Sequence, residues 1–560
     1  MKSTNVCLTF LAPTLLVVAA LAQPALAQSS GPIDPARLSA TVKDLASDAL
    51  QGRGPGTPGE TRTIDYLVGR LKALKLEPGG PGGSWTQAVP LVRTKLDGPA
   101  KVTVTGLGAP WTLRQDQEVY VNTVRPGARL SVAAAPMVFV GYGVKAPERG
   151  WDDFKGVDLK GKIAVFLVND PDFEAGPSEP VAGKFGGQAM TYYGRWTYKY
   201  EEAARRGAVG ALVIHEAPGA GYGWNTVIAP GGEDYDVVRP AKGHQPVALQ
   251  GWLHRDAAVE LFRRAGLDFD AQKKAARRSD FHPVALGAAK FSAEAKIAVT
   301  RVQSHNVLAR LTGAKRPLET VMYGAHWDAY GLGPPDAQGR TIRPGANDDG
   351  LGVAGLLEIA RAFKAGPTPE RTVVFAFWTA EERGLLGSET YAEHPVYPAA
   401  RVAANFTIDI MQTAGLSRDV VLIGAGQDSL EQDLARAAKA QGRTVTPDAH
   451  PERGLFYRAD HFSLAKRGVP TLLIMGIGGG PDLVQGGRAA GDRWVSDYTA
   501  HCYHQTCDAW SPDWNLAGAA QDVDLVYEAG KSIANSQAWP AWGAGSEFRA
   551  VREQTAGARK

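Results

Sequence analysis

The sequence predicts an α/β protein whose mostly parallel central sheet carries helices on both faces, together with a smaller β-rich α/β domain inserted in the chain. After Lys290, near-continuous apolar segments such as Val373–Trp378 alternate with helix-like segments, a pattern typical of a sheet buried on both faces. Between about Leu130 and Ala288, short strand-like segments are separated by Gly-rich loops. The length of 560 residues also favours two domains over one.

Residues 1–27 are predicted to be a signal peptide. Lys2 precedes the apolar core "LTFLAPTLLVVAALA", and the small residues "ALA" end at Ala27. The alternative is a membrane anchor, for which the apolar run is short. We therefore expect an exported protein, periplasmic or secreted, with no stable membrane anchor after the signal is cleaved.

The next elements predict the start of the larger domain. From Pro35 to Leu76, apolar residues recur at helical spacing on both sides of the Gly/Pro loop "QGRGPGTPGE". We assign residues 31–129 and 289–540 to this domain and residues 130–288 to the inserted one. Residues 541–560 lack periodicity and are rich in Gly, Ser and charge, so they are predicted to be disordered.

The remaining elements predict the sheet and its covering helices. The expected strands are "NVLARL", "ETVMYGA", "TVVFAFW", "VAANFTIDI", "VVLIGAG" and "TLLIMGIG". The expected helices are "LGVAGLLEIARAFKAG", "SLEQDLARAAKAQG" and a last one near Gln521–Asn535. In open sheets of this kind, ligands bind at the carboxyl ends of the strands.

Charge and cysteine content exclude some classes of function. The net charge of +3 is too balanced for a nucleic-acid-binding protein, which normally has a concentrated basic face. Cys7 lies in the predicted signal peptide, so Cys502 and Cys507 remain. In an oxidising compartment this pair predicts a disulfide, and two thiolates are too few for a Cys-rich metal site.

Acidic residues and histidines follow several of the predicted strands. They are His326 and Asp328 in "GAHWDA", Asp348 and Asp349 in "GANDDG", Glu381 and Glu382 in "TAEERG", Asp409 in "TIDI", and His504 and Asp508 in "YHQTCD". Singly, most have a structural explanation, since Asp348 can cap a helix and the two glutamates can favour a first helical turn. Asp409 differs, because a carboxylate inside an apolar strand needs a partner or a metal.

Taken together, these residues predict a metal site. Mixed imidazole and carboxylate ligands suit zinc, and an acid-rich shared site suits two Zn²⁺ ions bridged by a carboxylate. The charge of the metal would also offset the repulsion between the adjacent carboxylates of Glu381 and Glu382. One of the two can then bind metal while its neighbour stays a free base.

In this order, the motifs "GAHWDA", "GANDDG", "TAEERGLLGS", "TIDIM" and "YHQTCD" resemble the co-catalytic dizinc exopeptidases of metallopeptidase family 28, which includes aminopeptidases and glutamate carboxypeptidase. The resemblance covers about residues 34–126 and 290–535, and "LQGRGPGTPGE" is similar to a loop near the start of such enzymes. It implies the zinc exopeptidase fold. The inserted segment resembles a protease-associated domain in "GYG", "DLKGKIAVF" and "AARRGAVGALVI".

The resemblance also implies a role for each candidate residue. His326 and Asp409 would hold one Zn²⁺, Glu382 and His504 the other, and Asp348, followed by a cis peptide bond, would bridge both. Glu381 would be the general base. Asp328 would orient His326, and Asp508 would support His504 in the same way. Tyr503 would help to stabilise the tetrahedral intermediate, whereas Asp460 and His461 would have a structural or pocket-wall role.

The expected function is that of a zinc-dependent exopeptidase, first of all an aminopeptidase that hydrolyses N-terminal residues from peptides by a metal-activated water. A glutamate carboxypeptidase-like enzyme is the nearest alternative, and it would need basic residues such as Arg453 or Arg458 to hold a C-terminal carboxylate. A glutaminyl cyclase with one zinc is disfavoured by the intact "NDDG" and by the insertion. An inactive peptide-binding protein is disfavoured by the full ligand set.

Overall fold

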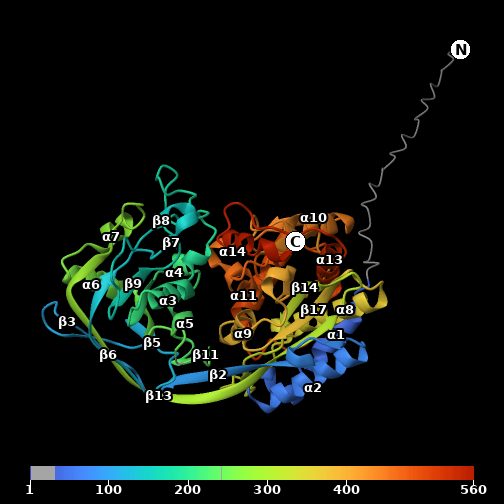
Figure 1. Cartoon of the computed structure of the whole chain (residues 1–560), viewed down its shortest axis with the longest axis horizontal. Helices are drawn as coiled ribbons and strands as arrows, with labels where there is room; N and C mark the ends of the chain where they lie inside the picture. The colour runs from blue at the N-terminus through green and yellow to red at the C-terminus, as the bar shows by residue number, and fades with distance from the viewer. Residues whose placement is uncertain (2–31, 241, 560) are drawn as a thin grey trace.

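The computed structural model describes residues 32–240 and 242–559 together with Met1, so the predicted signal peptide lies outside the described residues except for Met1. Figure 1 shows two lobes, joined along one side by the long strand β13 (Val284–Leu311). Within the described ranges, none of the helices has the length and apolar character needed to cross a membrane.

The larger lobe is built on a mixed sheet whose centre is parallel. Strands β21 (Thr471–Ile474), β18 (Val402–Ile408), β14 (Arg316–His326) and β17 (Arg371–Trp378) lie side by side in this order and run parallel. β13 pairs antiparallel with β17, and β2 (Thr86–Leu96) and β1 (Glu77–Pro78) pair antiparallel with β13. Every residue of β17 is buried, which confirms a sheet covered on both faces.

Helices cover the two faces of this sheet. On one face lie α1 (Pro35–Leu45), α8 (Gly352–Ala365) and α13 (Ala517–Ala534), with α2 (Pro58–Ala73) and α10 (Leu430–Ala440) completing the same core. On the other face lie α9 (Leu386–Glu393) and α11 (His461–Ala465). The predicted "VVLIGAG" strand forms as β19 (Asp419–Leu422), but it pairs with β20 (Thr444–Pro447) outside the main sheet.

The smaller lobe has its own core, and its strands continue the sheet of the larger lobe through β13, which pairs antiparallel with β6. β6 (Arg129–Phe139), β9 (Ile163–Leu167), β10 (Gly210–His215) and β12 (Leu249–His254) are parallel neighbours, with β5 (Val119–Asn122) antiparallel at the edge. The other strands and α-helices of this part of the chain are β3 (Lys101–Thr105), β4 (Trp111–Leu113), β7 (Lys145–Ala146), β8 (Trp151–Asp152), β11 (Glu233–Val237), α3 (Trp196–Arg205), α4 (Ala217–Ala220), α5 (Trp224–Ile228), α6 (Arg255–Arg264) and α7 (Phe269–Ala275).

The smaller lobe extends beyond the predicted limits of 130 and 288. Its core draws on buried residues from Ala100 to Ile297, because β3 pairs with the part of β13 that belongs to this lobe and β5 pairs with β12. The prediction from the sequence, which places residues 100–129 in the larger domain, is therefore wrong for this segment. The sequence becomes strongly apolar only near Leu130, so the short strands before it gave no signal of the lobe to which they belong.

The prediction of a disordered tail at residues 541–560 is wrong for the part that the structure describes. Residues Arg549–Gln554 form α14, and Phe548 is buried with its ring 5.0 Å from that of Trp542. Arg552 donates hydrogen bonds to the carbonyl oxygens of Val402 and Ala403. Two isolated aromatic anchors have no periodicity, so only the tertiary packing reveals that this segment is ordered.

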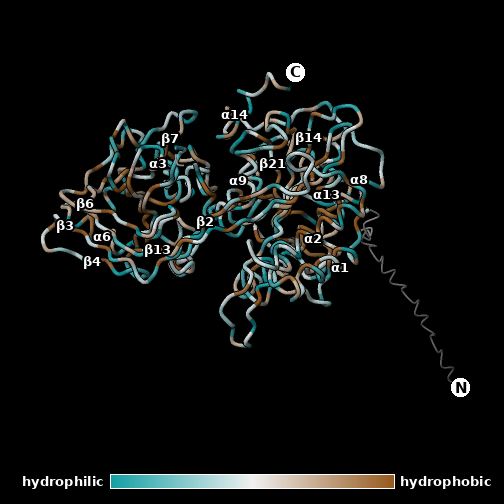
Figure 2. Tube along the Cα trace, turned by 60° about the horizontal axis from the view of Figure 1, so that its bottom comes forward, coloured by the Kyte–Doolittle hydropathy of each residue, from teal (hydrophilic) through white to brown (hydrophobic). Residues whose placement is uncertain are grey.

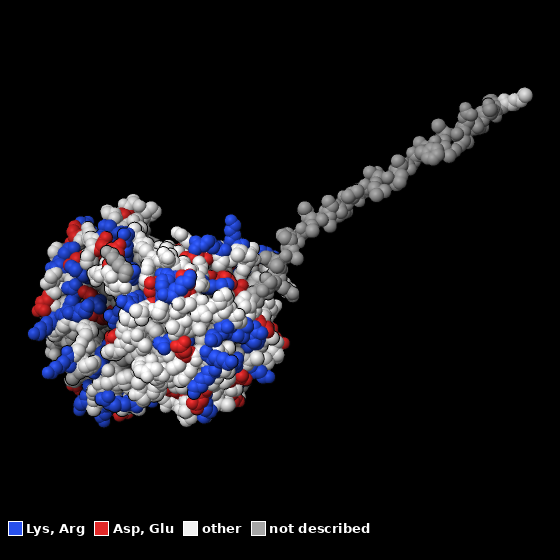
Figure 3. Space-filling view, turned by 45° about the vertical axis from the view of Figure 1, so that its right-hand side comes forward, with Lys and Arg blue, Asp and Glu red and all other residues white. Residues whose placement is uncertain are grey.

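In both lobes, apolar residues gather in the interior. Figure 2 shows hydrophobic residues gathered along the interior strands. On the face seen in Figure 3, basic and acidic side chains are interspersed on the surface.

Candidate metal centre

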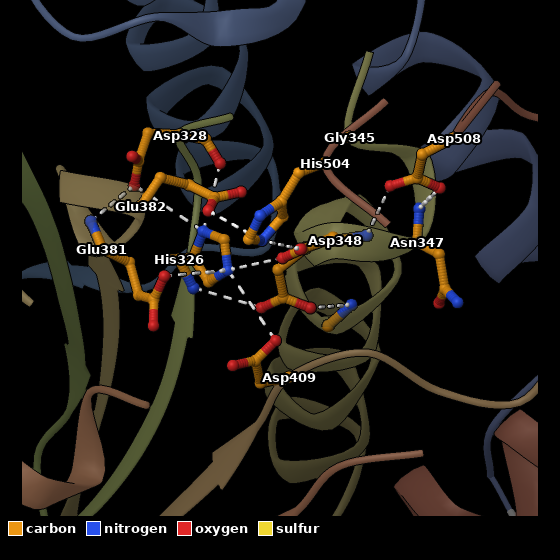
Figure 4. A network of polar contacts seen from close by, with 12 residues as sticks. His326, Asp328, Gly345, Asn347, Asp348, Glu381, Glu382, Asp409, His504 and Asp508 are labelled. Atoms are coloured by element: carbon orange, nitrogen blue, oxygen red, sulfur yellow. Dashed lines mark hydrogen bonds and ion pairs between the residues drawn. The ribbon is translucent and has the colours of Figure 1, made fainter. Parts of the chain in front are cut away.

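The carboxyl ends of three parallel strands bring the predicted site residues together. His326 is the last residue of β14, Asp409 directly follows β18, and Glu381 and Glu382 lie in the short helix η6 (Glu381–Arg383) just beyond β17. Asp348 comes from the segment Ala346–Leu351, which leads into α8. Figure 4 shows these side chains converging with His504, which reaches the centre from a loop after α12 (Gly487–Asp497).

Two groups of three side chains can each hold a metal ion, and they share Asp348. The first is His326, Asp348 and Asp409, and the second is Asp348, Glu382 and His504. His326 Nε2 lies 3.1 Å from Asp348 Oδ1 and 3.8 Å from Asp409 Oδ1. His504 Nε2 lies 3.2 Å from both Asp348 Oδ2 and Glu382 Oε2. Each oxygen of Asp348 therefore faces a different group.

The donor set fits zinc. Asp409 Oδ1 is buried and has no hydrogen-bond partner within the described part of the chain, although it points toward His326. An unpartnered carboxylate oxygen in the interior is costly unless a cation satisfies it. Burial likewise raises the pKa of Glu382 well above its ordinary value, and the carboxylate of Asp348 acts in the same direction. Two imidazoles with three carboxylates are ligands that zinc accepts.

Asp328 links the first group to Glu381. Its backbone carbonyl oxygen lies 3.1 Å from His326 Nδ1, and its carboxylate lies 3.6 Å from the same nitrogen. The same carboxylate accepts a hydrogen bond of 3.1 Å from the backbone N–H of Glu381. Asp328 is thus placed to fix the ring of His326 while holding the segment that carries Glu381.

Glu381 belongs to neither group, although its carboxylate lies 3.9 Å from His326 Nε2. Burial raises the pKa of Glu381 well above its ordinary value, and the carboxylates of Asp409 and Asp460 act in the same direction. A carboxylate that stays close to the ligands without being one of them can exchange a proton with a group bound there.

Asp508 has a different partner from the one expected. Its carboxylate accepts hydrogen bonds of 3.0 and 3.1 Å from the backbone N–H groups of Asn347 and Asp348, so it supports the residue that the two groups share rather than His504. The Asp348–Asp349 peptide bond is cis, as the resemblance implies. Cys502 and Cys507 form the predicted disulfide, which closes the short loop that carries His504.

Tyr503 lies beside a metal-ligand candidate, whereas His461 is enclosed in the protein interior. The ring of Tyr503 lies 3.6 Å from that of His504, and its hydroxyl accepts a hydrogen bond of 3.4 Å from Arg458 Nη2. His461 is fully buried with its ring 4.8 Å from that of Phe456, and burial lowers its pKa to about 3. A neutral, enclosed imidazole agrees with the structural role expected for His461.

Arg53 is a supporting residue that the sequence did not single out. It lies in the Gly/Pro loop after α1, is fully buried, and donates hydrogen bonds of 2.6–2.9 Å to the carbonyl oxygens of Leu45, Trp327, Pro344 and Gly345. These bonds tie the end of β14 to the segment that leads to Asp348. An arginine in a polar loop has no sequence signal that distinguishes it from a surface residue.

Replacing Arg53 with methionine is expected to lower the free energy of unfolding by on the order of 4 kcal/mol, because four buried carbonyl oxygens lose their donor. The zinc content should fall with it, since the bonds also hold the ligand loops. Chemical denaturation and metal analysis measure the two effects. Arg62→Met, at an exposed position of α2, is the control and should change stability by less than about 0.5 kcal/mol. A stable, zinc-loaded Arg53→Met protein would contradict this role.

The smaller lobe forms one wall of the cleft above the ligands. The cleft has a volume of about 430 Å³, and its lining includes Asp348, Glu381 and His504 of the larger lobe. The smaller lobe contributes Trp196, which begins α3, and Trp252, in β12, to the same lining. A substrate in this cleft would therefore contact both lobes.

Sequence comparison relates the chain to known peptidases. Residues 306–527 match the model of peptidase family M28. The chain is 37% identical over 101 residues to a "Vacuolar membrane protease" of Candida dubliniensis, covering 18% of this chain and 10% of that protein. It is 31% identical over 184 residues to a protein of Mycobacterium tuberculosis described as "Probable lipoprotein aminopeptidase LpqL", covering 30% of this chain and 34% of that protein. The chain thus spans from a tenth to about a third of the length of these curated relatives.

Two solved structures align with most of the chain at low sequence identity. The aminopeptidase from Aneurinibacillus sp. strain AM-1 is 19% identical with a TM-score of 0.48, and 89% of this chain and 93% of that one are covered. A zinc aminopeptidase from Bacillus subtilis is 18% identical with a TM-score of 0.42, covering 92% and 99%. The span that matches the family model contains all five residues of the two ligand groups. Residues 306–527 are thus similar to peptidase family M28 across the whole ligand set.

Proposed function

We propose that this protein is a zinc-dependent exopeptidase that acts as an aminopeptidase on peptides. The observation that carries the proposal is the pair of ligand groups that share Asp348, with the carboxylate of Glu381 3.9 Å from His326 Nε2 and part of neither group. Two zinc ions bound there would supply Lewis acidity that activates water and polarises the scissile carbonyl group. His326, Asp409, Glu382 and His504 would complete the ligand set.

The residues around the ligands support the remaining steps of peptide hydrolysis. Glu381 would accept a proton from the attacking water at its carboxylate and pass it to the nitrogen of the leaving amine as the bond from the carbonyl carbon breaks. Burial raises the pKa of Tyr503 well above its ordinary value, so its hydroxyl stays protonated and can donate to the oxyanion. Asp328 would keep the His326 ring in place during turnover.

The smaller lobe is part of the site in which a substrate would bind. Side chains of both lobes line the cleft that holds the ligand groups. We propose that this lobe is a protease-associated domain and that it helps to shape the substrate site. Export is also part of the proposal, on the basis of the sequence of residues 1–27.

A panel of free, N-acetylated and C-amidated dipeptides, tested with and without a chelator, examines this proposal. An aminopeptidase should cleave free and amidated dipeptides but not acetylated ones, and the chelator should abolish the activity because the zinc is removed. Cleavage that tolerates acetylation but requires a free C-terminal carboxylate would instead identify a carboxypeptidase. Arg458, which contacts Tyr503 at the cleft, is the observation that favours this second candidate. Turnover that survives the chelator would contradict both.

A further inference from the structure

Two arginines from different lobes line the cleft above the metal ligands. Arg195 directly precedes α3 in the smaller lobe. Arg458 follows the short helix η9 (Leu455–Tyr457) in the larger lobe. Both belong to the lining that also contains Asp348 and Glu381, so the two arginines share one cavity with the reacting groups.

Arg195 is buried without an anionic partner. Its exposed fraction is 7%, and its Nε has no hydrogen-bond partner among the residues that the structure describes. By contrast, Arg205, on the same α3, lies 2.7 Å from the carboxylate of Glu202. A guanidinium taken out of water without a counter-charge is unfavourable, so this position is better explained by a ligand that supplies one.

Arg458 adds a second cation to the same place. Burial lowers the pKa of Arg195 to about 10, and the positive charge of Arg458 opposes protonation further. Arg458 Nη2 also donates to Tyr503 Oη at 3.4 Å, which ties the cation pair to the ring beside His504. Two like charges in a partly enclosed cavity repel each other, and an anion between them would remove this repulsion.

We propose that Arg195 and Arg458 form a binding site for a carboxylate group of the peptide substrate. A guanidinium group binds a carboxylate through two parallel hydrogen bonds, a geometry that lysine does not offer. The carboxylate belongs either to the C-terminus of a dipeptide or to an acidic side chain beside the scissile bond. This substrate assignment rests on the proposed exopeptidase function. It makes the smaller lobe a part of the substrate site that selects short or acidic peptides.

Calorimetric binding to the zinc-loaded Glu381→Gln variant tests the proposal, because peptides should stay intact on it. One pair of ligands, Ala-Ala and its C-terminal amide, reports the terminal carboxylate. A second pair, the amides of Asp-Ala and Asn-Ala, reports an acidic side chain. In at least one pair, the carboxylate should improve affinity by about tenfold or more, and a further Arg195→Met substitution should abolish this preference.

Two further variants and a measurement of thermal stability separate an effect on binding from an effect on folding. Arg263→Met removes an exposed arginine of α6 in the same lobe and should leave the preference unchanged. Arg195→Met should not lower the thermal midpoint, because it removes a buried charge that has no partner, whereas a structural arginine would lose stability on replacement. If Arg195→Met does not fold, Arg458→Met provides the same measurement from the other lobe.

The outcomes distinguish this inference from the proposed function. Equal affinities within both pairs, or a preference that survives Arg195→Met, would overturn the carboxylate site even if the wild-type protein hydrolyses dipeptides. A preference that depends on Arg195 in a protein that hydrolyses none of the peptides would leave the carboxylate site standing and remove the exopeptidase assignment.

Discussion

Replacing Glu381 with glutamine is expected to lower kcat by about a thousandfold, within the range that a positioned general base contributes. Glutamine has nearly the same shape as glutamate but cannot take up a proton at the oxygen that faces the ligands. The residue is in neither ligand group, so both zinc ions should remain bound. Steady-state hydrolysis of a dipeptide and metal analysis of the same preparation measure the two quantities.

The neighbouring residue is the matched control. Glu382→Gln changes the same charge one position along the chain, but Glu382 lies 3.2 Å from His504 Nε2 in the second ligand group. It should therefore lower the zinc content, and Glu381→Gln should not. If Glu381→Gln kept its zinc and retained activity within about tenfold of the wild type, another group would have to be the base, because a lost general base costs at least about a hundredfold.

The contrast between these two glutamates follows from the end of β17. All eight residues of this strand are buried, and the chain then turns through Ala380, which has a positive φ of 53°, into the short helix η6. Successive residues of η6 point in different directions, so one carboxylate reaches His504 and the other faces His326. This local geometry explains how adjacent like charges can have separate roles in one site.

The sequence predicts most of this centre because the ends of the strands can be recognised from the apolar pattern. The apolar run of β17 stops shortly before Glu381, and Asp409 lies where the apolar pattern of β18 would otherwise continue. Parallel neighbours finish at one edge of a sheet, so residues that follow them must lie together. His504 does not follow a strand of the sheet, so its residue type made it a candidate, and the resemblance to a known family assigned it to the second ligand group.

The supporting residues could not be predicted in this way. The partners of Arg53 include carbonyl groups almost 300 positions away in the chain, and its contacts depend on how two loops meet after folding. Arg195 and Arg458 come from separate lobes, and neither has a pattern that sets it apart from surface arginines. The start of the smaller lobe near residue 100 could not be predicted for the same reason. Only the pairing of β3 with the distant strand β13 shows that β3 belongs to this lobe.

Asp348→Ala should remove zinc from both positions, because Asp348 is the one residue common to the two ligand groups. The stoichiometry should fall from two ions per chain to less than one, whereas Asp409→Ala and Glu382→Ala should each retain one ion. The activity of Asp348→Ala should fall by roughly a thousandfold or more, since the metal contributes several kcal/mol to the stabilisation of the transition state.

Zinc content measured after exhaustive dialysis, together with dipeptide hydrolysis, provides the readout for all three variants. Asn347→Ala serves as a neighbour control: its side chain accepts a hydrogen bond of 3.1 Å from Met411 N–H but belongs to neither ligand group, so both ions should remain. Retention of two ions by Asp348→Ala would mean that the two groups bind independently. The carboxylate would then be no bridge, and the function of the Asp508 hydrogen bonds beneath it would have to be explained by folding alone.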